Sequence, residues 1–213
     1  MEFGTSYIYR KDTSQKVSTA GEYIASRKKK RPHLNKLIQF SPIFACLSDD
    51  ELREFKKVII EKHFRRNETI LFEDDTSKFM YFIRSGKVKV VKMLAEGKEH
   101  ILAIHGKGES FGEMGILDGR TAPATVIALE DSNISLIKKD DFRCHLLKNE
   151  KVMQEIILML CSRLREAWLR LEVLNINKAE FRIRESLKLI GLQYGIKEQR
   201  GTMITLKLTH KEI

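Results

Sequence analysis

A change of hydrophobic period near residue 138 limits the possible folds more than any other feature of this chain. Before it, short apolar runs rich in β-branched and aromatic residues alternate with turn residues such as Gly, Asn and Asp. Strands this short, repeating roughly every 8–12 residues, are typical of an antiparallel sandwich or barrel, and Glu96-Gly97 predicts a hairpin turn. The expected strands lie at 58–60, 70–72, 80–83, 88–91, 101–104, 125–128 and 134–137.

A helical period replaces the strand period after Lys138. A short helix is expected from Asp140, and a long one from Asn149 or Glu150 to about Asn175. Apolar residues of the long helix recur at alternating spacings of three and four, which is the heptad pattern of a coiled coil. A seam this regular packs either against a second copy of the chain or against the chain's own β-domain. Its members are Ile157, Leu160, Leu164, Ala167, Leu171 and Leu174.

A short helix is also predicted before the first strand. Ser48 and Glu51, three residues apart, have the spacing of a capping box at a helix N-terminus. Leu47, Leu52 and Phe55 would pack on one face of this helix.

The region after the long helix begins a third unit. The sequence predicts a helix over 181–190, a strand over 203–208 and a capped helix that starts at Thr209. Because a single helical turn buries almost nothing, we expect this last helix to continue in sequence beyond Ile213.

Positive charge is concentrated toward the N-terminus of a chain whose net charge is +10. Residues 1–35 hold eight Lys and Arg against three Asp and Glu, with the densest run at 27–31. A weakly periodic, polar segment is typical of a mobile extension, whereas a basic cluster suits a polyanion. The segment is therefore either a solvated arm or an arm that touches DNA or another partner.

Several classes of protein are disfavoured by the sequence. No apolar stretch approaches the roughly 18–20 residues that cross a bilayer, and the N-terminus lacks the pattern of a secretion signal. Scattered cysteines fit a reducing cytoplasm, so we expect a cytoplasmic protein with no membrane partner. No Ser/His/Asp triad, paired-carboxylate motif or Walker loop is visible, and we expect no enzyme activity. The cysteines are Cys46, Cys144 and Cys161.

Four stretches in the same order resemble the CRP/FNR family of bacterial transcription regulators, over roughly residues 38–213. Residues 41–48 resemble the family's opening helix, and 81–90 its glycine-turn strand pair. Residues 108–119 resemble the front half of its phosphate-binding cassette, and 208–213 the start of its helix-turn-helix. The resemblance implies an α+β protein: an antiparallel β-roll of the jelly-roll, cyclic-nucleotide-binding type, a long dimerisation helix and a truncated winged helix-turn-helix.

Four segments follow from this reading. We expect a basic flexible extension over 1–36, the β-roll over 37–148, the dimerisation helix over 149–177, and the N-terminal part of an incomplete DNA-binding domain over 178–213.

The cassette provides a physical basis for effector binding. A phosphate needs free backbone N–H groups, which a glycine-containing loop leading into a helical turn supplies. Gly112 and Gly115 allow close backbone approach, and the resemblance implies that Glu113 hydrogen-bonds a ribose hydroxyl. Trp168, the only tryptophan, would either pack in the dimer or stack on an aromatic effector. The predicted effector-binding residues are Gly112, Glu113, Met114, Gly115, Arg120, Thr121, Thr125 and Trp168.

The chain departs from the family where a cyclic phosphate would be neutralised. Cyclic-nucleotide binders usually have Arg and then a small hydroxyl residue just before the strand that begins near Ala124. This chain has Ala122-Pro123 there, with Arg120 two residues earlier. Losing a charged partner costs on the order of 1.5–3 kcal/mol. Three alternatives remain: a cyclic nucleotide (cAMP or cGMP), a different small effector in the same pocket, or no effector.

Metal cofactors are not expected. An iron–sulfur cluster needs closely spaced cysteines, and Cys46 is the only cysteine before residue 100. His100 and His105 could in principle bind haem, but each fits an ordinary strand or loop histidine.

The predicted DNA contacts lie at the start of the last helix. In helix-turn-helix proteins the first helix crosses the phosphate backbone, so Thr209, His210 and Lys211 are expected to touch phosphate. The sequence thus favours a homodimeric, effector-controlled DNA-binding regulator, with RNA polymerase as a candidate further partner. The alternative is a cyclic-nucleotide regulatory module, or a haem or redox sensor, that does not itself bind DNA.

Overall fold

The computed structural model describes residues 41–94, 99–199 and 201–204, and two short helices come first in this part of the chain. They are α3 (Pro42–Ala45) and α4 (Asp49–Val58). The predicted capping box is confirmed: the Glu51 N–H donates to the Ser48 hydroxyl at 3.3 Å, and the Ser48 N–H donates to the Glu51 carboxylate at 2.6 Å. Leu52 and Phe55 are fully buried on the inner face of α4, so this amphipathic helix closes one end of the β-domain.

Eight strands form the antiparallel β-roll. One sheet has the order β1-β8-β3-β6 and the other has the order β2-β7-β4-β5. The pairing of β4 with β5, which places Met93 opposite Glu99, matches the predicted hairpin, while the turn residues 95–98 lie outside the described residues. The strands are β1 (Ile60–Phe64), β2 (Thr69–Leu71), β3 (Phe79–Ser85), β4 (Val88–Met93), β5 (Glu99–His105), β6 (Ser110–Phe111), β7 (Thr125–Ala128) and β8 (Ser132–Lys138).

Two hydrophobic clusters hold this arrangement together. One joins α3, α4 and the start of the long helix to the sheets through Phe44, whose ring centroid lies 5.2 Å from that of Phe55 and 4.7 Å from that of Phe82. The other fills the β-roll between its sheets and includes Ile83, Val88 and Ile134. Burial on this scale stabilises the domain mainly by removing apolar area from water.

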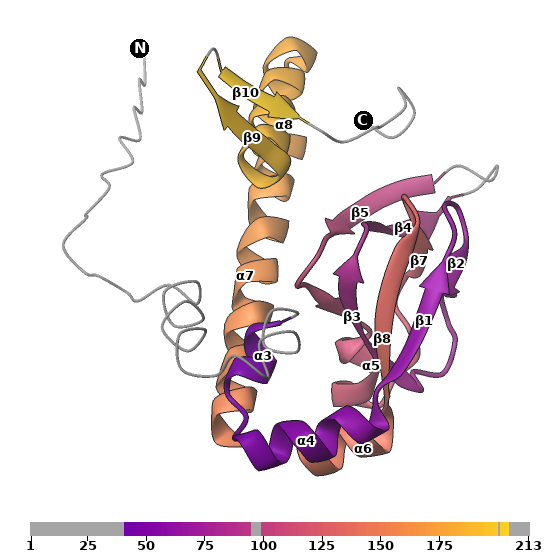
Figure 1. Ribbon diagram of the computed structural model, residues 1–213. Helices are drawn as coiled ribbons and strands as arrows, with labels where there is room; N and C mark the ends of the chain where they lie inside the picture. Colours follow the sequence, from indigo (N-terminus) through magenta and orange to yellow (C-terminus); the bar gives the residue numbers. More distant parts are fainter. Residues whose placement is uncertain (1–40, 95–98, 200, 205–213) are drawn as a thin grey trace.

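Four helices and a hairpin complete the part of the chain that the structure describes (Figure 1). After the short α5 (Glu113–Asp118) inside the β-roll come α6 (Lys139–His145) and the long α7 (Glu150–Leu174). The Asn149 side chain caps α7 by accepting the N–H groups of Lys151 and Val152 at 3.1 and 3.4 Å. α8 (Ala179–Tyr194) then leads into a hairpin of β9 (Gly195–Glu198) and β10 (Gly201–Ile204). None of the described helices is long and apolar enough to cross a membrane.

The predicted fold class is confirmed by this antiparallel β-roll and its long helix, with three local corrections. β1 begins at Ile60 rather than Val58, because α4 continues through Val58. The two-residue strand β6 and the strand β9 were not predicted. The predicted strand over 203–208 overlaps β10, which begins earlier, at Gly201. Its remainder, the helix expected from Thr209 and the basic N-terminal extension fall outside the described residues.

Candidate effector site

A glycine-bounded turn carries the central element of the site. β6 ends at Phe111, Gly112 takes a left-handed conformation (φ +84°), and α5 begins at once with Glu113. A Cβ atom on Gly112 would lie 2.9 Å from both the Phe79 carbonyl oxygen and the Tyr81 ring, so a side chain is excluded by space as well as by conformation. Gly115 packs more closely still, since a Cβ there would lie 2.5 Å from the Arg120 carbonyl oxygen and would also overlap the Ser77 hydroxyl. These contacts place the start of α5 close against β3 and the residues just before it.

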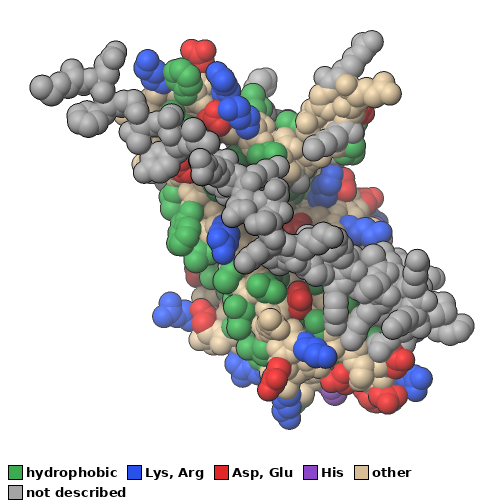
Figure 2. Space-filling model, turned by 90° about the vertical axis from the view of Figure 1, so that its left-hand side faces the viewer, with side chains coloured by type: hydrophobic (Ala, Val, Ile, Leu, Met, Phe, Trp, Pro, Cys, Tyr) green, Lys and Arg blue, Asp and Glu red, His purple; other side chains and the backbone are tan. Residues whose placement is uncertain are grey.

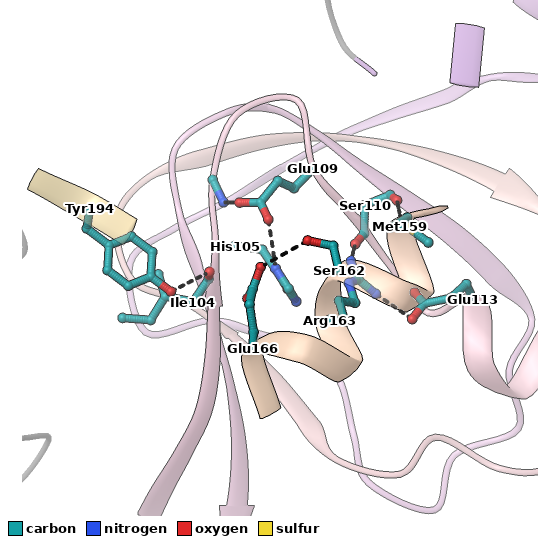
Figure 3. Close-up of polar contacts among 11 residues, drawn as sticks. Ile104, His105, Glu109, Ser110, Glu113, Met159, Ser162, Arg163, Glu166 and Tyr194 are labelled. Carbon is teal, nitrogen blue, oxygen red and sulfur yellow. Dashed lines mark hydrogen bonds and ion pairs between the residues drawn. The ribbon is translucent and has the colours of Figure 1, made fainter. Parts of the chain in front are cut away.

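Arg163 of α7 joins the cassette to the long helix. Its guanidinium is ion-paired with the Glu113 carboxylate and donates a second hydrogen bond to the Ser110 carbonyl (Figure 3). Glu113 is buried, with 3% exposure, and one of its carboxylate oxygens, Oε2, has no hydrogen-bond partner among the described residues. The Ser110 hydroxyl lies 3.4 Å from the Met159 sulfur one turn earlier on α7. The cassette and α7 are therefore mechanically connected through a planar, charged side chain.

The loop from β5 to β6 forms a second polar contact region next to this one. His105 Nδ1 lies 3.2 Å from Glu109 Oε1, and the Gly106 N–H donates to Glu109 Oε2 at 2.6 Å. From the far end of α8, the Tyr194 hydroxyl donates to the Ile104 carbonyl at 3.1 Å. Residues from the β-roll, α7 and α8 thus lie together in Figure 3.

Glu109 should titrate below the ordinary range of a glutamate. Partial burial acts to raise its pKa, but the hydrogen bond and charge of His105, the Gly106 N–H and the charge of Arg163 together lower it below 4.5. A depressed pKa contributes stability that is present above the unfolded pKa and is lost as the pH falls through the folded pKa. We expect NMR titration of the carboxyl carbon to show this depression in the wild type and a smaller one in His105→Ala. An unchanged pKa in that variant would contradict the assignment of the shift to His105.

The remaining predicted effector residues are dispersed around the cassette. Met114 is 49% exposed, and Arg120 and Thr121 are also exposed. Arg120 donates its backbone N–H to Asp118 at 2.9 Å, and Thr121 forms an isolated bridge with Thr76. Thr125 is buried, and its hydroxyl accepts the Glu73 N–H at 3.0 Å.

Sequence reasoning missed Arg163, which contacts the cassette most directly from outside it. The only local signal was an arginine flanking the apolar seam of α7, and several other charged residues share that property. Its role becomes visible only when α7 is docked on the β-roll.

Trp168 and the apolar seam lie on a different face of α7 from Arg163. At 100° per residue, Arg163, Glu166 and Arg170 share one face, and the seam is centred about a quarter turn away. Trp168 is 61% exposed beside that seam, in which Leu164 is 51% exposed. Figure 2 shows hydrophobic side chains gathered along the face of the molecule turned away from the β-roll. The predicted seam members that are more than half exposed are Ile157, Leu164, Leu171 and Leu174.

Other predicted functional residues are placed as follows. Cys46 is buried, whereas Cys144 and Cys161 are exposed. His105 is buried against Glu109, and His100 is exposed on β5. Among residues 41–94, 99–199 and 201–204, no group of three or more His, Cys, Asp or Glu is arranged to hold a metal ion. Thr209, His210 and Lys211 lie outside the described residues.

Comparison with known proteins gives a consistent result. The model of the cyclic nucleotide-binding domain family matches residues 61–149. The chain is 29% identical to the Cyclic AMP receptor protein of Thermus thermophilus over 69% of this chain and 68% of that protein. It is 26% identical to the CRP-like cAMP-activated global transcriptional regulator of Mycobacterium tuberculosis, over 84% and 80% respectively.

A solved structure supports the same fold. The crystal structure of the Thermus thermophilus Catabolite Activator Protein aligns with a TM-score of 0.54 at 22% identity, covering 77% of this chain and 93% of that one.

Proposed function

We propose that this chain, which is a CRP/FNR-type protein with a cyclic nucleotide-binding domain at residues 61–149, works as a homodimeric DNA-binding transcription regulator controlled by a small effector. The relatives compared above are regulators rather than enzymes, and we extend that role to this chain. RNA polymerase is a candidate partner of such a regulator.

The contact of Arg163 with Glu113 is the observation that carries the proposal. An effector that hydrogen-bonds Glu113 has to share this carboxylate with Arg163 or displace it. Either event changes the strength of the ion pair that joins the cassette to α7. A ligand can bias a conformational equilibrium only by interacting differently with its two states, and this ion pair gives an effector a direct means of doing so.

The apolar seam of α7 supports the homodimer. Several large side chains at heptad spacing are more than half exposed there, and contiguous exposed apolar patches mark interaction surfaces. A second copy of the same helix offers the complementary seam. The dimer would then contain two copies of the unit that begins with α8, and binding to a DNA site with two half-sites requires two such units.

DNA binding by the full chain tests this proposal. Fluorescence anisotropy with duplex DNA is expected to show binding that weakens as salt rises from 50 to 200 mM, because phosphate contacts release counterions. Lys211→Ala should reduce the slope of log K against log salt by about 1. Lys57→Ala, on the exposed face of α4, is the matched control and should leave the slope unchanged. Absence of salt-dependent binding, or equal effects of both variants, would contradict a DNA-binding role for residues 209–211.

A further inference from the structure

Glu113 has an unsatisfied acceptor that a bound ligand would have to satisfy. One carboxylate oxygen is paired with Arg163, while Oε2 is buried without a hydrogen-bond partner among the described residues. Buried polar atoms are nearly always hydrogen-bonded in native structures, so such an atom calls for an explanation. A carboxylate only accepts, and the missing group must be a donor such as a hydroxyl.

The adjoining segment offers few free donors to a phosphate. The Ala122 N–H donates to the Asp75 carbonyl at 2.9 Å, and the Ala122 carbonyl accepts the Asp74 N–H at 2.9 Å. Pro123 has no N–H to offer. The Thr125 hydroxyl accepts the Glu73 N–H at 3.0 Å and keeps its own O–H as a donor. The backbone between α5 and β7 is thus largely used in pairing with the loop that precedes β3.

The charged side chains within this segment are mostly acidic. Two of the acids are ion-paired with bases outside it, Glu73 with Lys92 and Glu113 with Arg163. Residues 72–78 and 112–123 contain five acidic and two basic side chains. Burial, together with the negative charge of Asp75, raises the pKa of Tyr81 to about 12. The Tyr81 ring packs closely against Gly112, since a Cβ there would lie 2.9 Å from it. The position just before β7 that is usually Arg in cyclic-nucleotide binders is Ala122 here, so a phosphate would depend on the exposed Arg120 to offset its desolvation.

We infer that the effector of this cassette is an uncharged molecule with vicinal hydroxyl groups, of which a ribonucleoside is the fitting class, rather than a cyclic phosphate. The inference rests on the proposed function and specifies its ligand. A ribonucleoside presents free 2′ and 3′ hydroxyls, both donors, to a buried carboxylate. A 3′,5′-cyclic nucleotide presents only the 2′ hydroxyl and adds a negative charge.

Isothermal titration calorimetry on the full chain tests the ligand class. Adenosine and guanosine are the probes, with cAMP and cGMP as charged competitors and free ribose as the other source of a vicinal diol. We expect at least one nucleoside to bind at least 10-fold more tightly than either cyclic nucleotide. 2′-Deoxyadenosine should bind about 10- to 100-fold more weakly than adenosine, because one charge-assisted hydrogen bond is lost. Ribose binding as tight as that of the nucleosides would assign the site to sugars and overturn the nucleoside class.

Variants test the location. Glu113→Gln should weaken nucleoside binding about 10- to 100-fold, whereas Glu61→Gln, on the distant strand β1, should leave it unchanged. Ala122→Arg with Pro123→Ser should strengthen cAMP binding at least 10-fold. Because Ala122 is buried, Pro123→Arg at an exposed position is a second route to the same gain, and a thermal melt verifies that each variant folds.

The outcomes separate this inference from the proposed function. Tighter binding of cAMP than of every nucleoside to the wild type would overturn the uncharged ligand while leaving an effector-controlled regulator in place. Silence of both classes at millimolar concentration would overturn the inference as well. The proposed function is judged independently by the salt-dependent DNA binding described above, which requires no ligand.

Discussion

Replacing Arg163 with alanine is expected to lower the free energy of unfolding by about 2–4 kcal/mol. Removing one member of a buried ion pair leaves the other charge without compensation in a low-dielectric site. In the variant, Glu113 would remain buried and neither of its carboxylate oxygens would have a hydrogen-bond partner among the described residues. The Ser110 carbonyl would also lose the hydrogen bond that Arg163 donates. The lower part of the expected range reflects the 24% exposure of the Arg163 side chain, which allows water to replace part of the interaction.

Urea denaturation of a double-mutant cycle isolates this effect. Arg163→Ala, Glu113→Gln and their combination should give a coupling free energy of about 1–3 kcal/mol, since the two residues are in direct contact. Arg165→Ala, two positions away on an exposed face of α7, is the control and should change stability by less than about 0.5 kcal/mol. Equal effects of Arg163→Ala and Arg165→Ala would mean that the ion pair contributes nothing to the docking of α7.

The features predicted correctly from the sequence are those encoded by neighbouring residues. The capping box of Ser48 and Glu51 depends on residues three positions apart. The predicted start of the long helix at Asn149 or Glu150 also matches α7. The strands of the β-roll follow from β-rich runs between turn residues, and the length of α7 follows from a heptad repeat. The limits of β1 were missed because Val58 suits both a helix end and a strand, and packing of α4 decided between them.

The candidate site was predictable only in part, because its contacts join distant segments. Glu113 and Arg163 are fifty residues apart, and no local pattern specifies which face of α7 meets the cassette. β6 has only two residues and is defined by its pairing with β3, not by an apolar run of its own. Tyr194 is a similar case, since its bond to the Ile104 carbonyl depends on how α8 returns toward the β-roll.

Introducing charge into the apolar seam of α7 is expected to separate the proposed dimer. Leu164→Glu with Leu171→Glu places two charges per protomer where heptad packing requires apolar side chains. Loss of burial of four leucines per dimer amounts to about 6 kcal/mol or more, which raises the dimer Kd by about 10⁴-fold. Sedimentation equilibrium should show a dimer for the wild type and a monomer for the variant. Phe72→Glu, at a 59% exposed position in the β-roll, should remain dimeric.

The same variant separates dimerisation from effector binding. Leu164 and Leu171 lie about a quarter turn of α7 away from Arg163, so the contact of Arg163 with Glu113 should survive in the monomer. Ligand binding within one chain should then be retained, while DNA binding, which gains from two half-sites, should weaken. If the seam variant stayed dimeric, the exposed leucines would not form the interface, and the link from effector to DNA would have to run through the contact of Tyr194 with the β-roll instead.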